Sequence, residues 1–127
     1  MRKSPTLTPA QMEIMNLLWE HGELGVAQVW KLLGKRRKVA RNTVQTTLSR
    51  LAEKGWLKAR AEANAYYFRP VHPRSSTLRG ILRQLMDSAF GGSASGLVMA
   101  LLEDRSISPE EARQIRELID RAQEDRR

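Results

Sequence analysis

The spacing of apolar residues changes from helical to alternating at Gly55, and this change limits the possible folds more than any other feature. Before it, apolar residues recur at intervals of three and four, which predicts three helices at about residues 9–21, 26–33 and 41–54. A brief strand is expected between the first two helices, at 24–26. After it, apolar and polar residues alternate, which predicts a β-hairpin at 56–60 and 65–69. A lone hairpin is only marginally stable, so it must pack on the helices. The order predicts a mainly α fold that starts with a winged helix-turn-helix, three helices plus a β-hairpin wing.

The boundaries of these elements carry residues that favour helix starts and turns. Thr8 is a good N-cap, and Gln11 three residues later can close a capping box. Glu62-Ala63-Asn64 is the expected turn of the hairpin, and residues 71–77 have the composition of a linker. We therefore expect a winged-helix DNA-binding domain at residues 1–74.

Residues 75–127 predict three more helices but too little mass for a core of their own. The helices are expected at about 76–89, 94–103 and 109–123, and their leucine-rich stripes would form exposed patches on a monomer. We therefore expect a helical dimerisation domain at 75–127. The predicted interface consists of Leu78, Ile81, Leu82, Leu85, Leu97, Val98, Leu101, Leu102, Ile115, Leu118 and Ile119. The alternative is that these helices fold back onto their own winged helix.

Positive charge is concentrated in the first of these two domains. Residues 1–74 hold 14 Lys and Arg against 5 Asp and Glu, whereas residues 75–127 hold 8 against 9. Such an excess in one domain indicates a polyanionic partner, with nucleic acid the first candidate and an anionic membrane surface the second. The alternative is a basic domain without such a partner.

The third helix has an outward face suited to reading DNA bases. On a helical wheel, the apolar residues gather on the core side, and up to Arg50 the opposite side offers hydroxyl, amide and guanidinium groups without an acid. Such groups pair with base edges, and the first turns of a recognition helix make most base contacts. The predicted base-reading residues are Asn42, Thr43, Gln45, Thr46 and Arg50. The alternative is an ordinary solvated face, although such faces usually carry more Glu and Lys.

Cations near this helix are suited to phosphate groups. A run of four basic residues precedes the helix, another begins it, and two arginines lie on the hairpin. Lys and Arg neutralise the DNA backbone without reading its sequence. The predicted phosphate contacts are Lys35, Arg36, Arg37, Lys38, Arg41, Arg60 and Arg69. A solvated loop and a nuclear localisation signal are the alternatives for the four-residue run.

Composition and motifs exclude several kinds of site. The chain has no cysteine, which excludes disulfides, thiolate metal sites and cysteine nucleophiles. His21 and His72 lack carboxylates at ligand spacing, and no catalytic pattern is present, so we expect no metal, no cofactor and no enzymatic activity. No apolar run approaches the roughly 20 residues of a membrane span, and the first residues do not form a signal peptide. We therefore expect a cytoplasmic protein without direct membrane binding.

The aromatic residues are assigned to packing rather than to stacking on bases. Trp19, Trp30 and Trp56 lie on apolar stripes or beside a helix stop, so we expect all three in the core. Tyr66 and Tyr67 alternate across the hairpin, so one should be buried and the other exposed.

The sequence resembles the BlaI/MecI/CopY family of bacterial penicillinase-type repressors. The matching stretches are Leu7-Thr8-Pro9-Ala10-Gln11, Leu18-Trp19, Asn42-Thr43-Val44-Gln45-Thr46, Glu53-Lys54-Gly55 and Ser108-Pro109-Glu110-Glu111. The resemblance implies a homodimer that binds inverted repeats in promoters and represses the adjacent genes. In the antibiotic-resistance branch it also implies a membrane sensor-protease that cuts the dimerisation domain. In the copper branch it implies metal binding by C-terminal cysteines.

The sequence departs from both branches at positions that concern induction. The lack of cysteine excludes copper sensing of that type. Ala100-Leu101 stands where antibiotic-responsive relatives are cut between Asn and Phe, so this bond is the candidate cleavage region for a protease of different specificity. Ala63 replaces a glycine common at the wing tip. Ala40 stands where Ser often caps the recognition helix, at a cost of about 1 kcal/mol.

Together these features predict a sequence-specific transcriptional repressor that acts as a homodimer on an inverted-repeat operator in double-stranded DNA. Proteolysis of the dimerisation domain is the mode of relief that the resemblance implies. Two alternatives stay open, a winged-helix regulator controlled by a ligand or partner protein and a winged helix used only for protein–protein interaction. A recognition face rich in acids or apolar groups would favour the second alternative.

Overall fold

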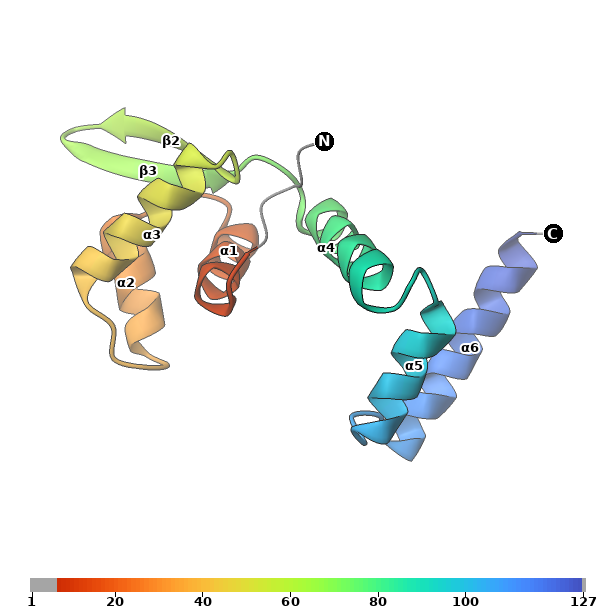
Figure 1. Cartoon of the computed structure of the whole chain (residues 1–127). Coiled ribbons are helices and arrows are strands. Elements are labelled where there is room, and N and C mark those ends of the chain that lie inside the picture. Colours follow the sequence, from red (N-terminus) through yellow and green to blue (C-terminus); the bar gives the residue numbers. More distant parts are fainter. Residues whose placement is uncertain (1–6, 127) are drawn as a thin grey trace. The chain divides into compact units, whose positions relative to one another are not determined.

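The computed structural model describes residues 7–126 (Figure 1). These residues contain six helices and one three-stranded sheet. Its contacts divide the chain into two units, Met1–Ile81 and Leu82–Arg127. The first unit contains, in order, α1 (Pro9–His21), β1 (Leu24–Gly25), α2 (Val26–Gly34), α3 (Arg41–Glu53), β2 (Leu57–Glu62) and β3 (Ala65–Pro70). This order of helix, strand, helix, helix and hairpin confirms the predicted winged helix-turn-helix.

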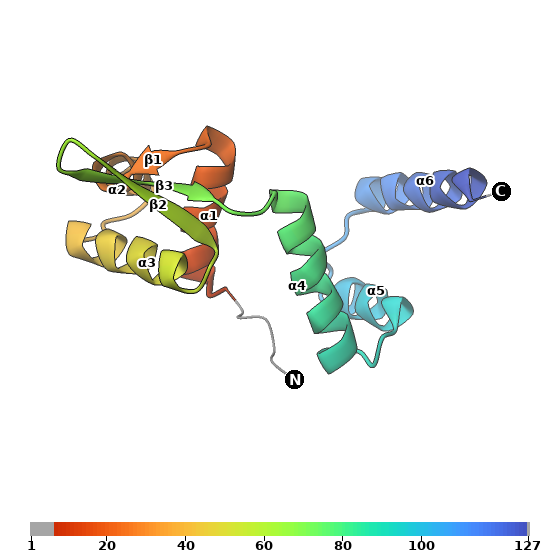
Figure 2. The ribbon, with the colours of Figure 1, turned by 90° about the horizontal axis from the view of Figure 1, so that it is seen from above.

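The sheet is antiparallel, and β3 lies between β1 and β2 (Figure 2). Leu24 pairs with Phe68 and Gly25 with Tyr67, while β2 and β3 pair along their whole length. Because successive side chains point to opposite faces of a sheet, Leu24, Leu57 and Phe68 share one face. All three are buried against the helices. The face that carries Tyr67 is therefore the outer face.

Aliphatic side chains form the core, where the three helices meet the sheet. From α3, Val44, Leu48 and Leu51 are buried, and they join Met15 and Leu18 of α1 in one cluster. Burying one such side chain stabilises a fold by about 1.5–3 kcal/mol. The cluster therefore holds α3 with one face inward along most of its length.

Of the three tryptophans, Trp19 and Trp56 pack against the core as predicted, whereas the prediction for Trp30 is wrong. Trp30 is 42% exposed, and its indole Nε1 donates a hydrogen bond to the carbonyl of Val39 (2.8 Å). Val29 takes the inward position next to it on α2. The indole therefore holds the loop before α3 instead of filling the core, since its N–H needs an acceptor.

Local hydrogen bonds set the helix ends where the sequence places them. Thr8 Oγ1 accepts from the Gln11 amide (3.1 Å), and Gln11 Oε1 accepts from the Thr8 amide (3.0 Å), which completes a capping box. After α3, Gly55 adopts a φ of +89°, and the amide of Trp56 donates to the carbonyl of Leu51 (2.9 Å). A left-handed glycine of this kind ends a helix and turns the chain. The chain therefore passes from α3 into the wing at Gly55.

The wing ends in a two-residue turn, Ala63-Asn64. The prediction of a turn over 62–64 is wrong at its first residue, because Glu62 pairs with Ala65 in the ladder. Ala63 and Asn64 have φ values of 49° and 65°, the signs that a type I′ hairpin turn requires. Asparagine tolerates this region, whereas the Cβ of alanine disfavours it. The turn therefore carries strain at Ala63.

The next helix, α4 (Arg74–Ala89), starts earlier than predicted, and the expected linker over 71–77 is wrong from Arg74 onward. The carbonyl of Pro73 accepts a hydrogen bond from the amide of Thr77 (3.2 Å), and Thr77 itself is buried. The serine-rich first turn of α4 has the composition of a loop, but these contacts hold it in a helical conformation. The division between the two contact units falls inside this helix, after Ile81.

The second unit contains the rest of α4, α5 (Ala94–Glu103) and α6 (Pro109–Asp125). Gly91 and Gly92, with φ values of 57° and 80°, separate α4 from α5. No residue of α5 or α6 is buried. In the part of the chain that the structure describes, no single helix is long and apolar enough to cross a membrane. Only α4 and α5 taken together, with a bend of 88° between them, pass that test.

Ala63→Gly is expected to stabilise the protein by about 1 kcal/mol, because glycine adopts a positive φ without the Cβ penalty. The measurement is the midpoint of urea unfolding, which should rise. Ala61→Gly in β2 is the matched control and should lower the midpoint, because a glycine inside a strand loses more chain entropy on folding. A lower midpoint for Ala63→Gly would contradict the turn described here.

Candidate nucleic-acid interface

The exposed face of α3 brings the five predicted base-reading residues together. Asn42, Thr43, Gln45, Thr46 and Arg50 are all exposed, while the opposite side of the helix is buried in the core. From Asn42 to Arg50 this face holds hydroxyl, amide and guanidinium groups and no carboxylate, whereas Glu53 adds an exposed acid at its C-terminal end. It therefore offers the donors and acceptors that match base edges in a major groove.

The start of α3 adds positive potential at one end of this face. Ala40, the N-cap residue, makes no side-chain hydrogen bond to the first turn. The first N–H groups of the helix therefore have no capping side chain, and they form the positive end of the helix dipole next to Arg41. Thr47 differs from its neighbours, because its hydroxyl donates back to the carbonyl of Thr43 (2.8 Å). It is a structural residue of the helix.

The loop between α2 and α3 carries the predicted run of four cations, and two contacts hold it in place. The guanidinium of Arg37 pairs with Glu13 of α1 at 2.9 Å. Further along, the indole of Trp30 holds the carbonyl of Val39. The other cations of the run are exposed, Lys35, Arg36 and Lys38. All four cations are therefore at the surface, and Arg37 alone among them is paired with a carboxylate of the described residues.

The two predicted phosphate-binding arginines of the wing have different surroundings. Arg60 pairs with Glu23, which precedes β1, and with Glu62, each at 2.8 Å. Arg69 is exposed and lies opposite Lys58 in the ladder. Like charges directly opposite each other destabilise a sheet, and a bound anion would relieve that repulsion. Lys58 and Arg69 therefore form the more suitable anion site.

The ion pair between Glu23 and Arg60 shifts both groups toward their charged forms. The hydrogen bond from Arg60 holds the pKa of Glu23 below its ordinary value of 4.5, and the bonds to Glu23 and Glu62 raise the pKa of Arg60. A carboxylate whose pKa falls on folding contributes its stability above the unfolded pKa and loses it as the pH falls through the folded value. The pair is therefore fully formed at neutral pH and is lost in acid below the ordinary value of 4.5.

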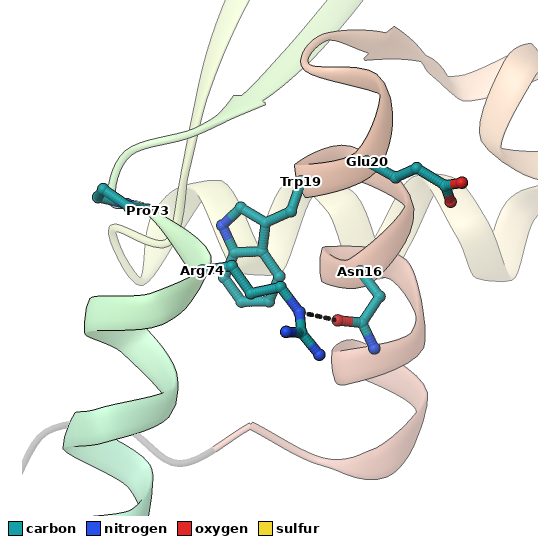
Figure 3. A pocket seen from close by; sticks show the side chains of 5 residues that line it. All are labelled: Asn16, Trp19, Glu20, Pro73 and Arg74. Atoms are coloured by element: carbon teal, nitrogen blue, oxygen red, sulfur yellow. Dashed lines mark hydrogen bonds between the residues drawn. The ribbon is translucent and has the colours of Figure 1, made fainter. Parts of the chain in front are cut away.

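An open pocket of about 490 Å³ lies where the chain leaves the wing and meets α1 (Figure 3). Trp19 Nε1 donates to the carbonyl of His72 (2.9 Å), and Arg74 Nε donates to Asn16 Oδ1 (3.2 Å). The residues that line the pocket are Asn16, Trp19, Glu20, Pro73 and Arg74. The two hydrogen bonds fasten the start of α4 to α1, so the lining residues join parts of the first unit.

The described residues offer hydrogen-bond donors and positive charge at the surface of the first unit. Between residues 7 and 126, no group of three or more His, Asp or Glu side chains is placed to hold a metal ion. The shifted pKa values belong to Glu23 and Arg60, which pair with each other. This arrangement is suited to the binding of a polyanion.

The predicted dimerisation residues lie on α4, α5 and α6, and most of them are exposed. On α6, Leu118 and Ile119 are 60% and 50% exposed. The other exposed members are Leu82, Leu85, Val98, Leu101 and Leu102, and the half-buried ones are Leu78, Ile81, Leu97 and Ile115. The candidate cleavage region, Ala100-Leu101, is also exposed, within α5.

The sequence did not predict the roles of three residues that hold the basic loop and the wing in place, namely Glu13, Glu23 and Trp30. The two acids act on arginines that are 24 and 37 residues away in the chain. A surface carboxylate gives no local pattern from which such a partner could be inferred. One signal exists for Glu23, since strand alternation puts it on the face opposite to Leu24 and thus on the side of Arg60. This alternation identifies Arg60 as the partner of Glu23 only when the register of the sheet is known.

A helix with an exposed polar face, a basic loop before it and a β-wing after it define a winged helix-turn-helix DNA-binding protein. A family model described as penicillinase repressor matches residues 7–121. The penicillinase repressor of Bacillus licheniformis is 26% identical over 120 residues, which cover 94% of each of the two chains. The chain therefore belongs to the penicillinase repressor family.

Solved structures agree with this assignment over the first unit. The solution structure of the DNA-binding domain of the repressor BlaI has a TM-score of 0.52 and 32% identity, and covers 59% of this chain and 92% of its own. The Bacillus licheniformis BlaI monomer in complex with the blaP half-operator has a TM-score of 0.50, with the same 32% identity and coverage of 59% and 92%. The predicted family and the predicted class, a DNA-binding transcriptional repressor, are confirmed by these matches.

Arg50→Ala is expected to reduce the preference for a specific sequence by about 1–3 kcal/mol, the value of one bidentate base contact. The measurement compares binding to a selected DNA fragment with binding to a shuffled duplex of equal length. Ser49→Ala, on the neighbouring exposed position, is the control. If Arg50→Ala weakened both duplexes equally, Arg50 would be a backbone contact.

Lys38→Ala is expected to weaken binding to all sequences alike and to reduce the salt slope of the binding constant by about 0.9, because one released counterion is lost. The measurement is a series of titrations between low and moderate salt. Lys31→Ala removes the same charge from α2, outside the basic loop, and serves as the control. A change in sequence preference would show that Lys38 contacts bases.

Proposed function

We propose that this protein is a homodimeric repressor that binds an inverted-repeat operator through α3 and the wing of each chain. The observation that carries the proposal is the surface of α3, whose inner side is buried and whose outer side exposes polar donors from Asn42 to Arg50. The half-operator complex of the related BlaI supports the use of this unit for DNA. Two such helices related by a two-fold axis require a pseudo-palindromic site.

Within this interface we assign sequence reading to Asn42, Thr43, Gln45, Thr46 and Arg50. The phosphate contacts are assigned to Lys35, Arg36, Lys38, Arg41, Lys58 and Arg69. Their support is exposure beside the recognition face or on the wing. Arg37 and Arg60 are left out of this set, because each is paired with a carboxylate of its own chain.

Dimerisation is assigned to the second unit, which has too little buried surface to be stable as an isolated body. Large apolar side chains are exposed along all three of its helices. Exposed apolar patches of this kind mark interaction surfaces. The near-balance of charge in residues 75–127, 8 cations and 9 anions, also permits two copies to meet.

Release from DNA is assigned to loss of the dimer. The Ala100-Leu101 bond in α5 is the proposed cleavage region for a membrane sensor-protease. Cleavage there would divide the apolar surface and leave monomers, which bind an operator more weakly than dimers because the second half-site no longer adds to the first. The protein acts without catalysis of its own and works in the cytoplasm, where it meets DNA.

Selection of bound fragments from a random DNA pool at near-physiological salt tests this function, with the mass of the complex determined alongside. The expected result is an enriched inverted repeat with two chains bound. Failure to enrich any sequence would make a winged helix used for protein–protein interaction the better assignment. Enrichment of a single half-site with one chain would overturn the dimer alone.

Leu118→Glu is expected to convert the dimer to a monomer, because it places a charge in an apolar contact. Affinity for the whole operator should fall roughly 100-fold, because the two chains no longer bind the two half-sites together, while affinity for a half-site should not change. Light scattering and titration with whole and half operators measure the two effects. Glu117→Gln, next to it on α6, is the control and should leave the mass unchanged. A wild-type protein that is already monomeric would contradict the assignment.

A further inference from the structure

The outer face of the sheet carries a closed cluster that the DNA-binding function does not account for. Glu23, Gly25, Arg60, Glu62 and Tyr67 form this cluster, which we term the wing clamp. The register places Arg60 opposite Tyr67 and Tyr67 opposite Gly25. The cluster therefore crosses all three strands, from the connection before β1 to the hairpin.

All three nitrogens of the Arg60 guanidinium donate hydrogen bonds within the wing clamp, and the side chain stays 47% exposed. Nε and Nη2 donate to the Glu23 carboxylate at 3.0 and 2.8 Å, and Nη1 donates to Glu62 at 2.8 Å. The guanidinium carbon lies 5.0 Å from the centre of the Tyr67 ring, within the range of a cation–π contact. Each of the three nitrogens thus has a carboxylate partner, and one side of the plane covers an aromatic ring.

Tyr67 contacts β1 as well as Arg60. A Cβ added at Gly25 would lie 3.2 Å from Tyr67 Cε1, so the ring closes over the glycine backbone. β1 contributes only two residue pairs to the sheet, Leu24 with Phe68 and Gly25 with Tyr67. The Gly25 backbone, the Tyr67 ring and the Arg60 guanidinium therefore form a stack, and Glu23 holds the guanidinium in place. This stack strengthens the attachment of the hairpin to β1, which the short ladder would otherwise provide alone.

We infer that Arg60 is a positioning residue, which holds the wing through Glu23 and Tyr67 and so fixes how Lys58 and Arg69 are presented to DNA. This role rests on the proposed function, since it concerns the same wing. It replaces the prediction that Arg60 contacts phosphate directly. Its physical basis is that the bidentate, stacked arginine is fixed in place and that the carboxylates of Glu23 and Glu62 already balance the charge that would attract a phosphate.

The two roles give opposite results for Glu23→Gln. If Arg60 contacts phosphate, Glu23 competes for the guanidinium, and its neutralisation frees Arg60 and strengthens binding. If Arg60 positions the wing, the same change loosens the wing and weakens binding. Arg60→Lys separates them again, because lysine keeps the charge but provides neither the bidentate geometry nor the stacking.

The experiment measures binding of the full chain to the fragment recovered by the selection and to a shuffled duplex, over a range of salt. For Glu23→Gln, Arg60→Met and Arg60→Lys we expect roughly fivefold weaker binding to the selected fragment, the size of one well-formed ion pair. The salt slope should not change, whereas loss of a phosphate contact would lower it by about 0.9. The double variant Glu23→Gln with Arg60→Met should bind no worse than either single variant.

Glu20→Gln is the matched control, since it removes the same charge from the end of α1, where Glu20 has no arginine partner within residues 7–126. It should leave fragment binding within the error of the wild type. Stronger binding by Glu23→Gln than by Glu20→Gln would overturn the inference. So would a lower salt slope for Arg60→Met, or wild-type affinity for Arg60→Lys.

Hydrogen exchange in the free protein tests the wing clamp without DNA. Amides of β2 and β3 should exchange roughly fivefold faster in Arg60→Met and Glu23→Gln, and amides of α3 should not change. Unchanged exchange in the wing would overturn the inference even if DNA affinity fell. Faster exchange in a protein that binds no specific DNA would support the clamp and contradict the proposed function, so the two failures can be told apart.

Discussion

Burial of one side of α3 is the constraint on which the rest of this structure depends. Val44, Leu48 and Leu51 join the side chains of α1 and α2 in a single apolar cluster. Once these positions face inward, the helix cannot rotate without exposing them to water, at about 1.5–3 kcal/mol for each side chain. The polar residues on the opposite side are then held outward in a fixed orientation. The same burial that stabilises the fold therefore creates the surface that meets DNA.

The structure gives its cations two different tasks. Arg37 and Arg60 are held by carboxylates from distant segments, and they tie the basic loop and the wing to the body of the first unit. Lys35, Lys38 and Arg69 lie on these same segments without an ion pair to a carboxylate of the described residues. An exposed cation attracts DNA more effectively when the segment that carries it is already ordered, because less conformational entropy is lost on binding. The paired arginines and the exposed cations are thus complementary.

The two units differ in how completely they satisfy their apolar residues. The first has a closed core built from three helices and a sheet, whereas α5 and α6 of the second bury no residue. Short helices in a segment of this size cannot cover one another, because too much of their surface faces water. A unit of this kind reaches stability by association, which is why we assign the dimer to it. Regulation that acts on this unit would control DNA binding without altering the recognition face.

What the sequence by itself determined were the features that depend on neighbouring residues. The capping box of Thr8 and Gln11, the turn of the chain at Gly55 and the polar face of α3 all follow from spacing within one or two helical turns. What only the tertiary structure decided were features that depend on register and on distant partners. The pair of Arg60 with Glu23 spans 37 residues, the outward place of Trp30 depends on the carbonyl of Val39, and the two-residue turn depends on how β2 meets β3. Local spacing cannot encode these contacts, because they exist only after the core has brought separate segments together.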